Sequence, residues 1–357
     1  MKKVDALVFA AAPPPIGGVA SIVAMLHQGF ANRNDIAFLS PAAREPRPLA
    51  GFVRPLKNII RLTRAVSQVR EGGRVLLFSS AGGSFFEKIL WSLLVVSRAR
   101  IAVVVMVAGN FPSFWNKLPL MFRRIASRII RSPLFELTAQ SEAWRNYYRS
   151  IFPLATIKKV GATVAAEFFE RPISAARGEE ILYVGWIIPE KGILDLLDAM
   201  AILSETHPGA NLRLVGPLFG KEEFWNKSAL ERGIASQVKF IGAISDRTGL
   251  IREFDNAAVF VFPSHFEGFP VALLEAIARG LACVGTTVGG IPDILEHGQA
   301  GVLVEPKAPL ELAEAFRSLI EDPGRRETFS KRAAVRARTA YSHAECMGSY
   351  KRLLELK

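Results

Sequence analysis

Short apolar segments alternate with longer segments of helical periodicity along most of the chain. Eleven of the apolar segments have the length and the β-branched content of buried strands. They are residues 4–11, 36–40, 74–79, 101–107 and 134–140, followed by 181–185, 211–216, 238–242, 259–264, 282–287 and 301–305. Because strands that alternate with helices are typical of βαβ units, the pattern predicts an α/β protein with two doubly wound parallel sheets.

A polar segment without strong periodicity, residues 170–180, separates the two sets of strands. We interpret it as a linker between an N-terminal domain, residues 1–169, and a C-terminal domain, residues 181–335. Residues 336–357 are expected to form a C-terminal helix, with packing against the N-terminal domain as one option. The length of 357 residues is typical of two domains.

The N-terminus places two lysines before an apolar run, as a signal peptide does. Asp5 interrupts that run and three prolines follow it, so a buried first strand is the better interpretation. The other long apolar stretches, residues 89–97 and 101–109, are much shorter than the ~20 apolar residues of a membrane-spanning helix. We therefore expect no transmembrane segment.

Half of the residues are apolar, and only two are cysteines, Cys283 and Cys346. This composition predicts a folded protein of a reducing compartment, which favours a cytoplasmic location. The sequence has no CxxC motif and no Cys/His cluster, so neither a disulfide nor a structural zinc site is expected.

The formal net charge of +12 is unevenly distributed, because residues 1–170 carry +14 and residues 171–357 carry −2. Between Lys88 and Phe135 there are eight basic residues and no acidic one. Such a segment favours an anionic partner: nucleic acid, a phosphate-bearing substrate or an acidic membrane surface. No nucleic-acid-binding motif accompanies the charge, so nucleic acid is not the expected partner.

The loop after residues 259–264 leads into a predicted helix and carries two glutamates, Glu267 and Glu275. Ligands of open parallel sheets bind beyond the carboxyl ends of the strands, which makes this loop a candidate site. Positions 271–278 are apolar apart from Glu275, so its carboxylate is expected to need a hydrogen-bond partner. That partner is either a neighbouring protein group or a ligand.

Two segments in this half carry a family resemblance. Residues 263–295, PSHFEGFPVALLEAIARGLACVGTTVGGIPDIL, resemble the donor-site signature of the retaining glycosyltransferases of family 4, with two Glu separated by seven residues and a later turn at Gly289-Gly290. Residues 182–199, LYVGWIIPEKGILDLLDA, are similar to the phosphate loop of the same family. The resemblance covers about residues 180–325 and implies the GT-B architecture, two Rossmann-like domains facing a central cleft.

The resemblance implies a role for each matching residue. Glu275 corresponds to the residue that holds the ribose hydroxyls of the donor, Glu267 to a catalytic residue near the transferred sugar, and Lys191 to the lysine that neutralises the diphosphate. A cation and helix N-terminal amides stabilise a departing nucleotide, so no metal or other cofactor is expected. The other donor-binding residues it implies are Gly17, Gly18, Gly185, Gly216, Ile244, His265, Gly268, Phe269 and Leu274.

Some of these assignments have ordinary alternatives, and two positions depart from the family pattern. Gly17-Gly18 is equally compatible with a plain βα turn. Trp186 follows Gly185, where the family usually has an arginine or lysine, and Ala108 lies near the expected position of a histidine. Either another basic residue substitutes for the missing ones, or the transferase is slow, specialised or inactive.

Residues 116–131 have helical periodicity, with an apolar face opposite a basic one. Aromatic residues precede this segment. Such a helix either packs on the sheet with a solvated basic face or docks on an anionic membrane. The residues expected to contact a membrane are Phe114, Trp115, Arg124, Arg128 and Arg131.

Taken together, the motifs predict a retaining glycosyltransferase that moves a hexosyl or N-acetylhexosaminyl group from a nucleotide sugar to a glycan or lipid-linked saccharide in bacterial cell-surface polysaccharide synthesis. The expected location is the cytoplasm, with peripheral binding to the inner face of the cell membrane. The alternatives are a non-catalytic GT-B partner protein that binds a nucleotide sugar or glycan, and a nucleotide-sugar epimerase.

Overall fold

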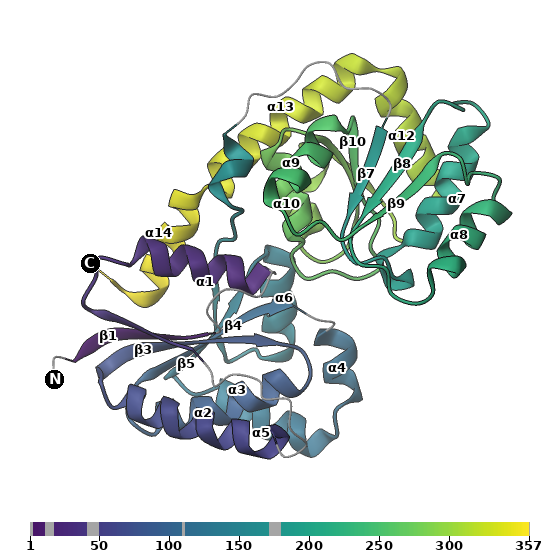
Figure 1. Cartoon of the computed structure of the whole chain (residues 1–357). Coiled ribbons are helices and arrows are strands. Elements are labelled where there is room, and N and C mark those ends of the chain that lie inside the picture. The colour runs from purple at the N-terminus through teal and green to yellow at the C-terminus, as the bar shows by residue number, and fades with distance from the viewer. Residues whose placement is uncertain (1–2, 11–17, 41–49, 109–110, 171–179, 357) are drawn as a thin grey trace. The chain divides into compact units, whose positions relative to one another are not determined.

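The computed structural model describes residues 3–10, 18–40, 50–108, 111–170 and 180–356 (Figure 1). The chain forms two compact units, described separately below. Unit 1 comprises Met1–Ala162 together with His343–Lys357, and unit 2 comprises Thr163–Ser342. Nearly all of the expected linker, and Gly17, lie outside the described residues.

Unit 1 contains a parallel sheet of six strands in the order β2-β1-β3-β4-β5-β6. The strands are β1 (Val4–Phe9), β2 (Ile36–Leu39), β3 (Val69–Ser80), β4 (Ile101–Ala108), β5 (Phe135–Ala139) and β6 (Thr156–Lys159). The first five are the predicted strands, and β6 was not predicted. It is a short edge strand of sequence TIKK, too polar to be recognised by its hydrophobicity.

Helices cover both faces of this sheet. Leu26 of α1 and Tyr350 of α14 belong to the core of one face, which lies above the sheet in Figure 1. Leu62 of α2, Phe85 of α3 and Ile130 of α5 belong to the core of the other face. The bounds are α1 (Gly18–Gly29), α2 (Ala50–Val66), α3 (Gly83–Val96), α4 (Phe111–Lys117), α5 (Leu120–Ile130), α6 (Glu142–Ile151) and α14 (His343–Leu354).

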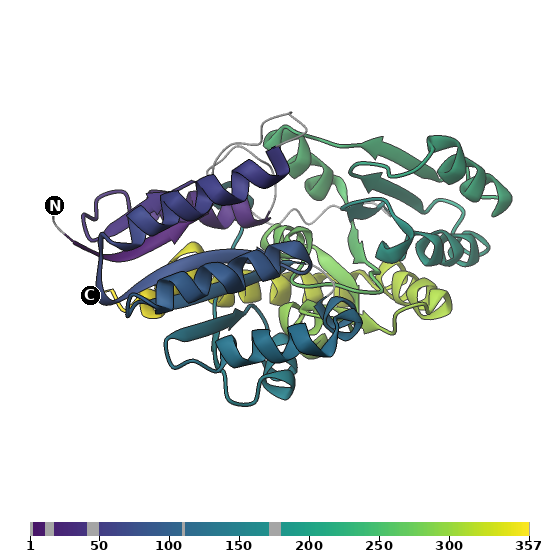
Figure 2. The ribbon, with the colours of Figure 1, turned by 90° about the horizontal axis from the view of Figure 1, so that it is seen from below.

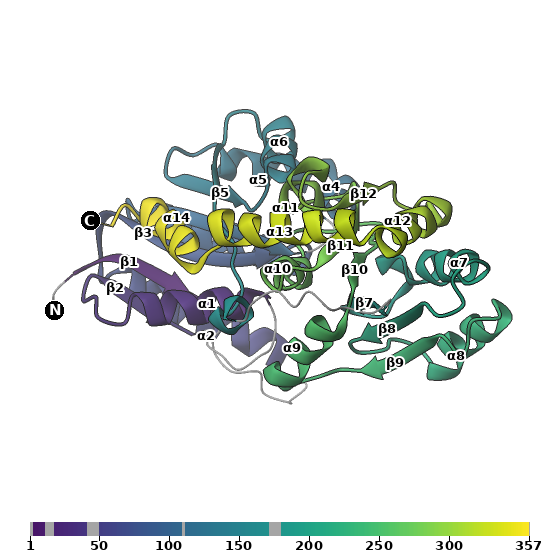
Figure 3. The ribbon, with the colours of Figure 1, turned by 90° about the horizontal axis from the view of Figure 1, so that it is seen from above.

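Unit 2 contains the second parallel sheet, in the order β12-β11-β10-β7-β8-β9, and Figure 3 shows the strands in this order. They are β7 (Glu180–Val184), β8 (Asn211–Val215), β9 (Val238–Gly242), β10 (Val259–Phe262), β11 (Ala282–Thr286) and β12 (Val302–Val304). The helices are α7 (Ile193–Ser204), α8 (Glu222–Glu231), α9 (Arg247–Asn256), α10 (Val271–Ala278), α11 (Ile291–Ile294), α12 (Pro309–Glu321) and α13 (Pro323–Ala340). Both predicted doubly wound sheets are therefore confirmed.

The strand order of unit 2 locates a switch point between β7 and β10. From β7 the chain continues to β8 and β9 on one side, and β10, β11 and β12 then lie on the other side. At such a point the loops that follow two neighbouring strands diverge and leave a crevice at their carboxyl ends. The loops after β7 and β10 carry Lys191 and Glu267, the two residues predicted to be catalytic.

Candidate functional site

Lys191 and Glu267 meet at the switch point of unit 2. The Lys191 ammonium forms an ion pair with Oε2 of Glu267, and both side chains are mostly buried. The amide of Gly268 donates to Oε1 of the same carboxylate over 3.0 Å. The ammonium also lies 5.7 Å from the centre of the Phe262 ring, a cation–π contact. One carboxylate thus holds the two groups, a lysine and an amide, that were predicted to contact the donor.

A close backbone approach sets the position of Lys191. A 3-10 turn (Pro189–Lys191) follows β7, and Gly192 then adopts a left-handed φ of 70° before α7 begins. A Cβ on Gly192 would lie 2.0 Å from the carbonyl oxygen of Pro263, in the loop after β10. Only glycine fits there, so the loop after β7 packs closely against the loop that carries Glu267.

A second glycine turn supports Glu267 from the other side. Gly289 has a φ of 57°, and a Cβ there would lie 2.0 Å from the carbonyl oxygen of Glu267. The amide of Gly290 donates to the carbonyl of Gly268 over 2.9 Å. The loop after β11 therefore packs directly on the backbone of the candidate catalytic residue.

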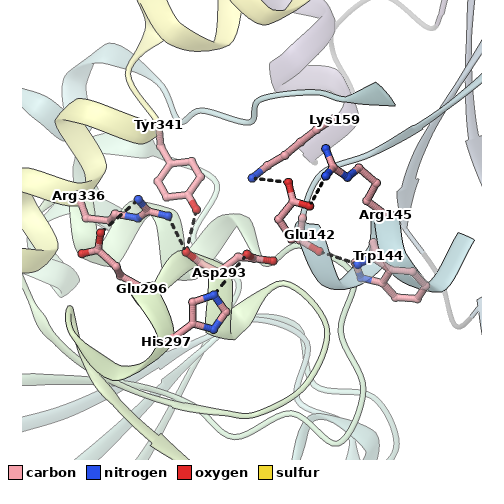
Figure 4. Close-up of polar contacts among 10 residues, drawn as sticks. Glu142, Trp144, Arg145, Lys159, Asp293, Glu296, His297, Arg336 and Tyr341 are labelled. Carbon is pink, nitrogen blue, oxygen red and sulfur yellow. Dashed lines mark hydrogen bonds and ion pairs between the residues drawn. The ribbon is translucent and has the colours of Figure 1, made fainter. Parts of the chain in front are cut away.

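The helix after this turn is tied to α13 (Figure 4). Arg336 and Tyr341 both donate to the carbonyl oxygen of Asp293 in α11, over 3.0 and 3.1 Å. The Arg336 guanidinium also reaches the carboxylate of Glu296 at 3.5 Å. These bonds hold α11, and with it the turn at Gly289-Gly290, against the long helix that follows the sheet.

Glu275 carries the most perturbed carboxyl group of the site. Its side chain keeps some solvent-accessible surface, but protein surrounds the carboxyl group. Loss of hydration raises its pKa to about 8, and the positive charge of Arg247 opposes the shift only partly. Within the residues that the structure describes, no group hydrogen-bonds to this carboxylate. The site therefore contains an acceptor that the protein itself leaves unsatisfied.

Three contributing residues were missed by the sequence analysis. Asp195, on the first turn of α7, pairs with Nε2 of His265. The hydroxyl of Tyr183 donates to the carbonyl of Trp186 over 2.9 Å, and burial together with the charge of Glu267 raises the pKa of Tyr183. Arg247 is the first residue of α9 and donates a hydrogen bond to Glu167 over 2.6 Å. Its positive charge lowers the pKa of Glu275. Nothing in the sequence marks the partners of Asp195 and Arg247, because each of these contacts joins separate elements.

The other predicted donor-site residues of unit 2 fall into two groups. Gly185 and Gly216 end β7 and β8, where their amides donate to the carbonyls of Val215 and Gly242. Ile244 lies half-buried in the loop before α9. Phe269 and Leu274, by contrast, are 7% and 1% exposed, so their side chains belong to the core. For these two, only backbone groups remain as candidates for ligand contact.

The predicted residues of unit 1 are only partly described. Gly18 begins α1, and Ala108 ends β4. The helix expected over residues 116–131 is interrupted at Pro119, and only Leu120–Ile130 continues as α5. Trp115 departs from the expectation of a membrane contact, since it is 6% exposed and stacks on Phe111. Phe114 is half-buried, whereas Arg124, Arg128 and Arg131 are exposed.

Two general features of the described residues complete the picture. No helix among them is long and apolar enough to cross a membrane. In the same part of the chain, no group of three or more His, Cys, Asp or Glu residues is arranged to hold a metal ion.

Known proteins resemble this chain at two levels. Residues 166–336 match the family described as glycosyl transferases group 1. Glycogen synthase of Mycobacterium tuberculosis is 34% identical over 158 residues, which cover 44% of this chain and 37% of that protein. The chain thus spans little more than a third of the length of this relative.

Solved structures resemble the whole chain in fold. HepE of Anabaena, solved in complex with UDP, has a TM-score of 0.77 at 17% identity and covers 99% of this chain and 100% of its own. Sucrose-phosphate synthase of Thermosynechococcus elongatus has a TM-score of 0.78 at 17% identity, with 98% and 99% covered. With its two parallel sheets the chain has a GT-B fold, and the part that carries the candidate donor site, residues 166–336, matches the group 1 glycosyltransferase family.

Proposed function

We propose that the protein transfers a sugar from a nucleoside diphosphate sugar to a saccharide acceptor, with retention of the anomeric configuration and without a metal ion. One observation carries the proposal. The segment after β10 carries Glu267, which pairs with Lys191 of the loop after β7, and, two turns on, a Glu275 carboxylate that no described group hydrogen-bonds. A partly buried acceptor without a protein partner is stabilised when a ligand donates to it, and the two ribose hydroxyls of a nucleotide are suitable donors.

Each residue then has a chemical task. The bond between the anomeric carbon and the diphosphate oxygen breaks, and the acceptor hydroxyl forms the new bond and releases its proton. Negative charge grows on the diphosphate, where the Lys191 ammonium and the amides of Gly268 and Phe269 stabilise it. Glu267 lies at the sugar, and Glu275 binds the ribose. The transferred group is proposed to be a hexosyl or N-acetylhexosaminyl unit.

A thermal-shift panel of UDP-, GDP- and ADP-sugars tests donor binding. A ligand at 100 times its dissociation constant adds about 2.7 kcal/mol to the free energy of unfolding. UDP is the first nucleotide to try, because the HepE structure contains it. The same shift is expected with a chelator present. A shift that requires added metal would contradict the metal-free part of the proposal, and no shift with any nucleotide sugar would contradict donor binding itself.

The acceptor is proposed to be a lipid-linked saccharide on the inner face of the cell membrane, as in cell-surface polysaccharide synthesis. The support is a surface of unit 1 that we call the α2/α3/α5 face, on the side seen in Figure 2. Eight large apolar side chains on it are at least 39% exposed: Ile59, Ile60, Leu90, Leu93, Leu120, Met121, Phe122 and Ile125. An exposed apolar surface of this extent marks an interaction site.

The charges on this face suit an anionic bilayer. Exposed basic residues flank the apolar ones, among them Arg61, Arg64, Arg124, Arg128 and Arg131. The sequences of the three helices contain one acidic residue, Glu87, which pairs with Lys88. Each basic residue near an acidic membrane contributes about 1 kcal/mol, and salt screens this attraction.

Sedimentation with vesicles tests the membrane part. Binding should rise with the fraction of acidic lipid and fall with salt. Replacement of Arg124, Arg128 and Arg131 by Gln should remove about 3 kcal/mol of binding free energy and most of the bound protein. A matched control replaces three basic residues of unit 2, Lys221, Lys227 and Lys239. Binding that ignores salt and lipid charge would contradict a membrane role.

A non-catalytic GT-B protein that binds a nucleotide sugar is the second candidate, because Trp186 stands in place of the usual cation. An epimerase on the same fold has less support, since the pattern of Glu267 and Glu275 is that of transferases. Release of free nucleoside diphosphate from a nucleotide sugar, with transfer to water or to a saccharide, distinguishes the three. A binding protein gives no release, and an epimerase gives a new nucleotide sugar instead.

A further inference from the structure

Two aromatic side chains lie exposed beside the candidate donor site. Trp186 follows the end of β7 and is 58% exposed, and Phe219 lies in the loop after β8 and is 48% exposed. Their ring centres are 5.0 Å apart, with the planes inclined by 42°. Large aromatic rings are usually well buried, so a pair left open at the ligand-binding edge of a sheet is a candidate binding surface.

The backbone around both rings is firmly held. A β-bridge joins Ile187 and Leu218 and continues the pairing of β7 with β8 beyond the strands. The amide of Ile187 donates to Pro217 over 3.0 Å, and that of Phe219 donates to Ile187 over 3.2 Å. The indole of Trp225 donates to the carbonyl of Phe219 over 3.2 Å. The backbone that carries the two rings is therefore pre-organised, which lowers the entropy cost of binding a ligand there.

The pair also has a defined link to the residues that handle the sugar. The carbonyl of Trp186 accepts a hydrogen bond from Tyr183, whose ring stacks on Phe262, the ring that the Lys191 ammonium contacts. Trp186 itself is five residues before Lys191 in the same loop. A ring bound on this surface would lie beside the Lys191–Glu267 pair.

We propose that Trp186 and Phe219 form a stacking subsite for the apolar face of a pyranose ring, which deepens the proposed function and rests on it. The rings themselves offer no charge for a phosphate, whose proposed partner is the Lys191 ammonium. The two ring planes are inclined by 42° and both rings are exposed, so they form an open platform and not a slot between parallel surfaces. The C–H groups of a sugar suit such a platform, and its hydroxyls suit the indole N–H of Trp186, which has no hydrogen-bond partner in the described part of the chain.

The pyranose can belong to the donor or to the acceptor, and fluorescence distinguishes these sources. Trp186 is 58% exposed, while Trp91, Trp115 and Trp225 are at most 6% exposed and Trp144 is half-buried. The difference in acrylamide quenching between the wild type and Trp186→Phe thus reports on this one indole. UDP, GDP and ADP are compared with UDP-glucose, GDP-mannose and ADP-glucose, and maltotriose serves as a free saccharide.

Protection of Trp186 by a nucleotide sugar but not by its parent diphosphate assigns the subsite to the donor, and protection by maltotriose assigns it to the acceptor. Trp186→Ala and Phe219→Ala should each weaken binding of the protecting compound about 3- to 10-fold and leave the affinity for the bare diphosphate unchanged. Trp186→Phe should keep most of the affinity. Leu230→Ala, which removes a 68% exposed side chain of α8, is the control and should change neither.

Two results would refute the assignment of Trp186 and Phe219 as a sugar-binding subsite. One is equal protection by the bare diphosphate, which would place the base or phosphate on the rings. The other is binding of sugars or nucleotide sugars, seen by thermal shift, with no change in Trp186 quenching. Failure of the proposed function has a different signature, because the wild type would then bind neither the nucleotides nor the nucleotide sugars.

Discussion

Replacing Glu275 by glutamine removes the charge of this side chain and keeps its size. Burial raises the pKa of Glu275 to about 8 from an ordinary value of 4.5. Below pH 4.5 the group is protonated in both the folded and the unfolded chain, so its contribution to stability is fully present. As the pH rises from 4.5 to about 8, the unfolded chain releases the proton and the folded chain keeps it. The wild type therefore loses stability over this window, and Glu275→Gln does not.

The size of the effect follows from the two pKa values. One unit of difference corresponds to about 1.4 kcal/mol in the free energy of unfolding. With 4.5 in the unfolded chain and about 8 in the folded one, the wild type should lose about 2 to 3 kcal/mol relative to the variant between pH 5 and pH 7. Urea unfolding followed by circular dichroism at pH 5, 6, 7 and 8, at constant ionic strength, measures this difference.

A matched control and a clear negative result accompany this experiment. Glu205 is an exposed residue just after α7, and Glu205→Gln should follow the wild type at every pH. A constant offset between wild type and Glu275→Gln across the whole range would refute the reasoning. It would mean that the Glu275 carboxylate is well hydrated or well bonded, and the argument for a ligand hydroxyl as its missing partner would fail with it.

Further predictions concern the same site. Nucleotide binding at pH 7 should release a proton from Glu275, detected as a dependence of the calorimetric heat on the buffer, and Glu275→Gln should abolish this release and weaken nucleotide binding by about 1 to 3 kcal/mol. Lys191→Ala should also weaken it, and unchanged affinity in both variants would refute the donor site. Glu267→Ala should lower turnover without weakening diphosphate binding, whereas a loss as large as that of Glu275→Gln would contradict separate roles. Gly289→Ala should destabilise the fold by more than about 1 kcal/mol relative to Gly298→Ala, which also has a positive φ but open space around its Cβ, and equal urea midpoints would refute the clash.

The pattern of hydrophobic residues was sufficient to predict most strands of both sheets. It was insufficient to predict the edge strand β6 or the helices over residues 116–131. Eleven strands were predicted because each contains a run of apolar side chains, and the central strands β10 and β11 are buried at every residue, as is typical of parallel sheets. The edge strand β6 lacks that signal, since three of its four residues are polar. The break at Pro119 and the burial of Trp115 were missed because periodicity alone treats residues 116–131 as one helix.

The residues of the candidate site also divide into those that the sequence predicted and those that it did not. Glu267, Glu275 and Lys191 were predicted from short motifs, in which spacing along the chain reflects the turn that each residue occupies, and their roles at a donor site stay a prediction. Asp195 and Arg247 were not, because their partners His265 and Glu167 are 70 and 80 positions away. Contacts of this kind depend on which strands are neighbours, and the order β10-β7-β8 is not evident from the sequence. The topology of the sheet, rather than any motif, brings the two loops together.

The ion pair at the switch point bears on the order of events in binding. Glu267 holds both Lys191 and the amide of Gly268, the groups proposed to stabilise the diphosphate. A diphosphate carries more negative charge than one carboxylate, so it competes well for the same cation and amide. The exchange would leave the Glu267 carboxylate free of Lys191 and close to the anomeric carbon, where positive charge develops as the nucleotide departs. Glu267 therefore opposes diphosphate binding slightly and favours the reaction, which is why its removal should affect turnover and leave diphosphate affinity unchanged or tighter.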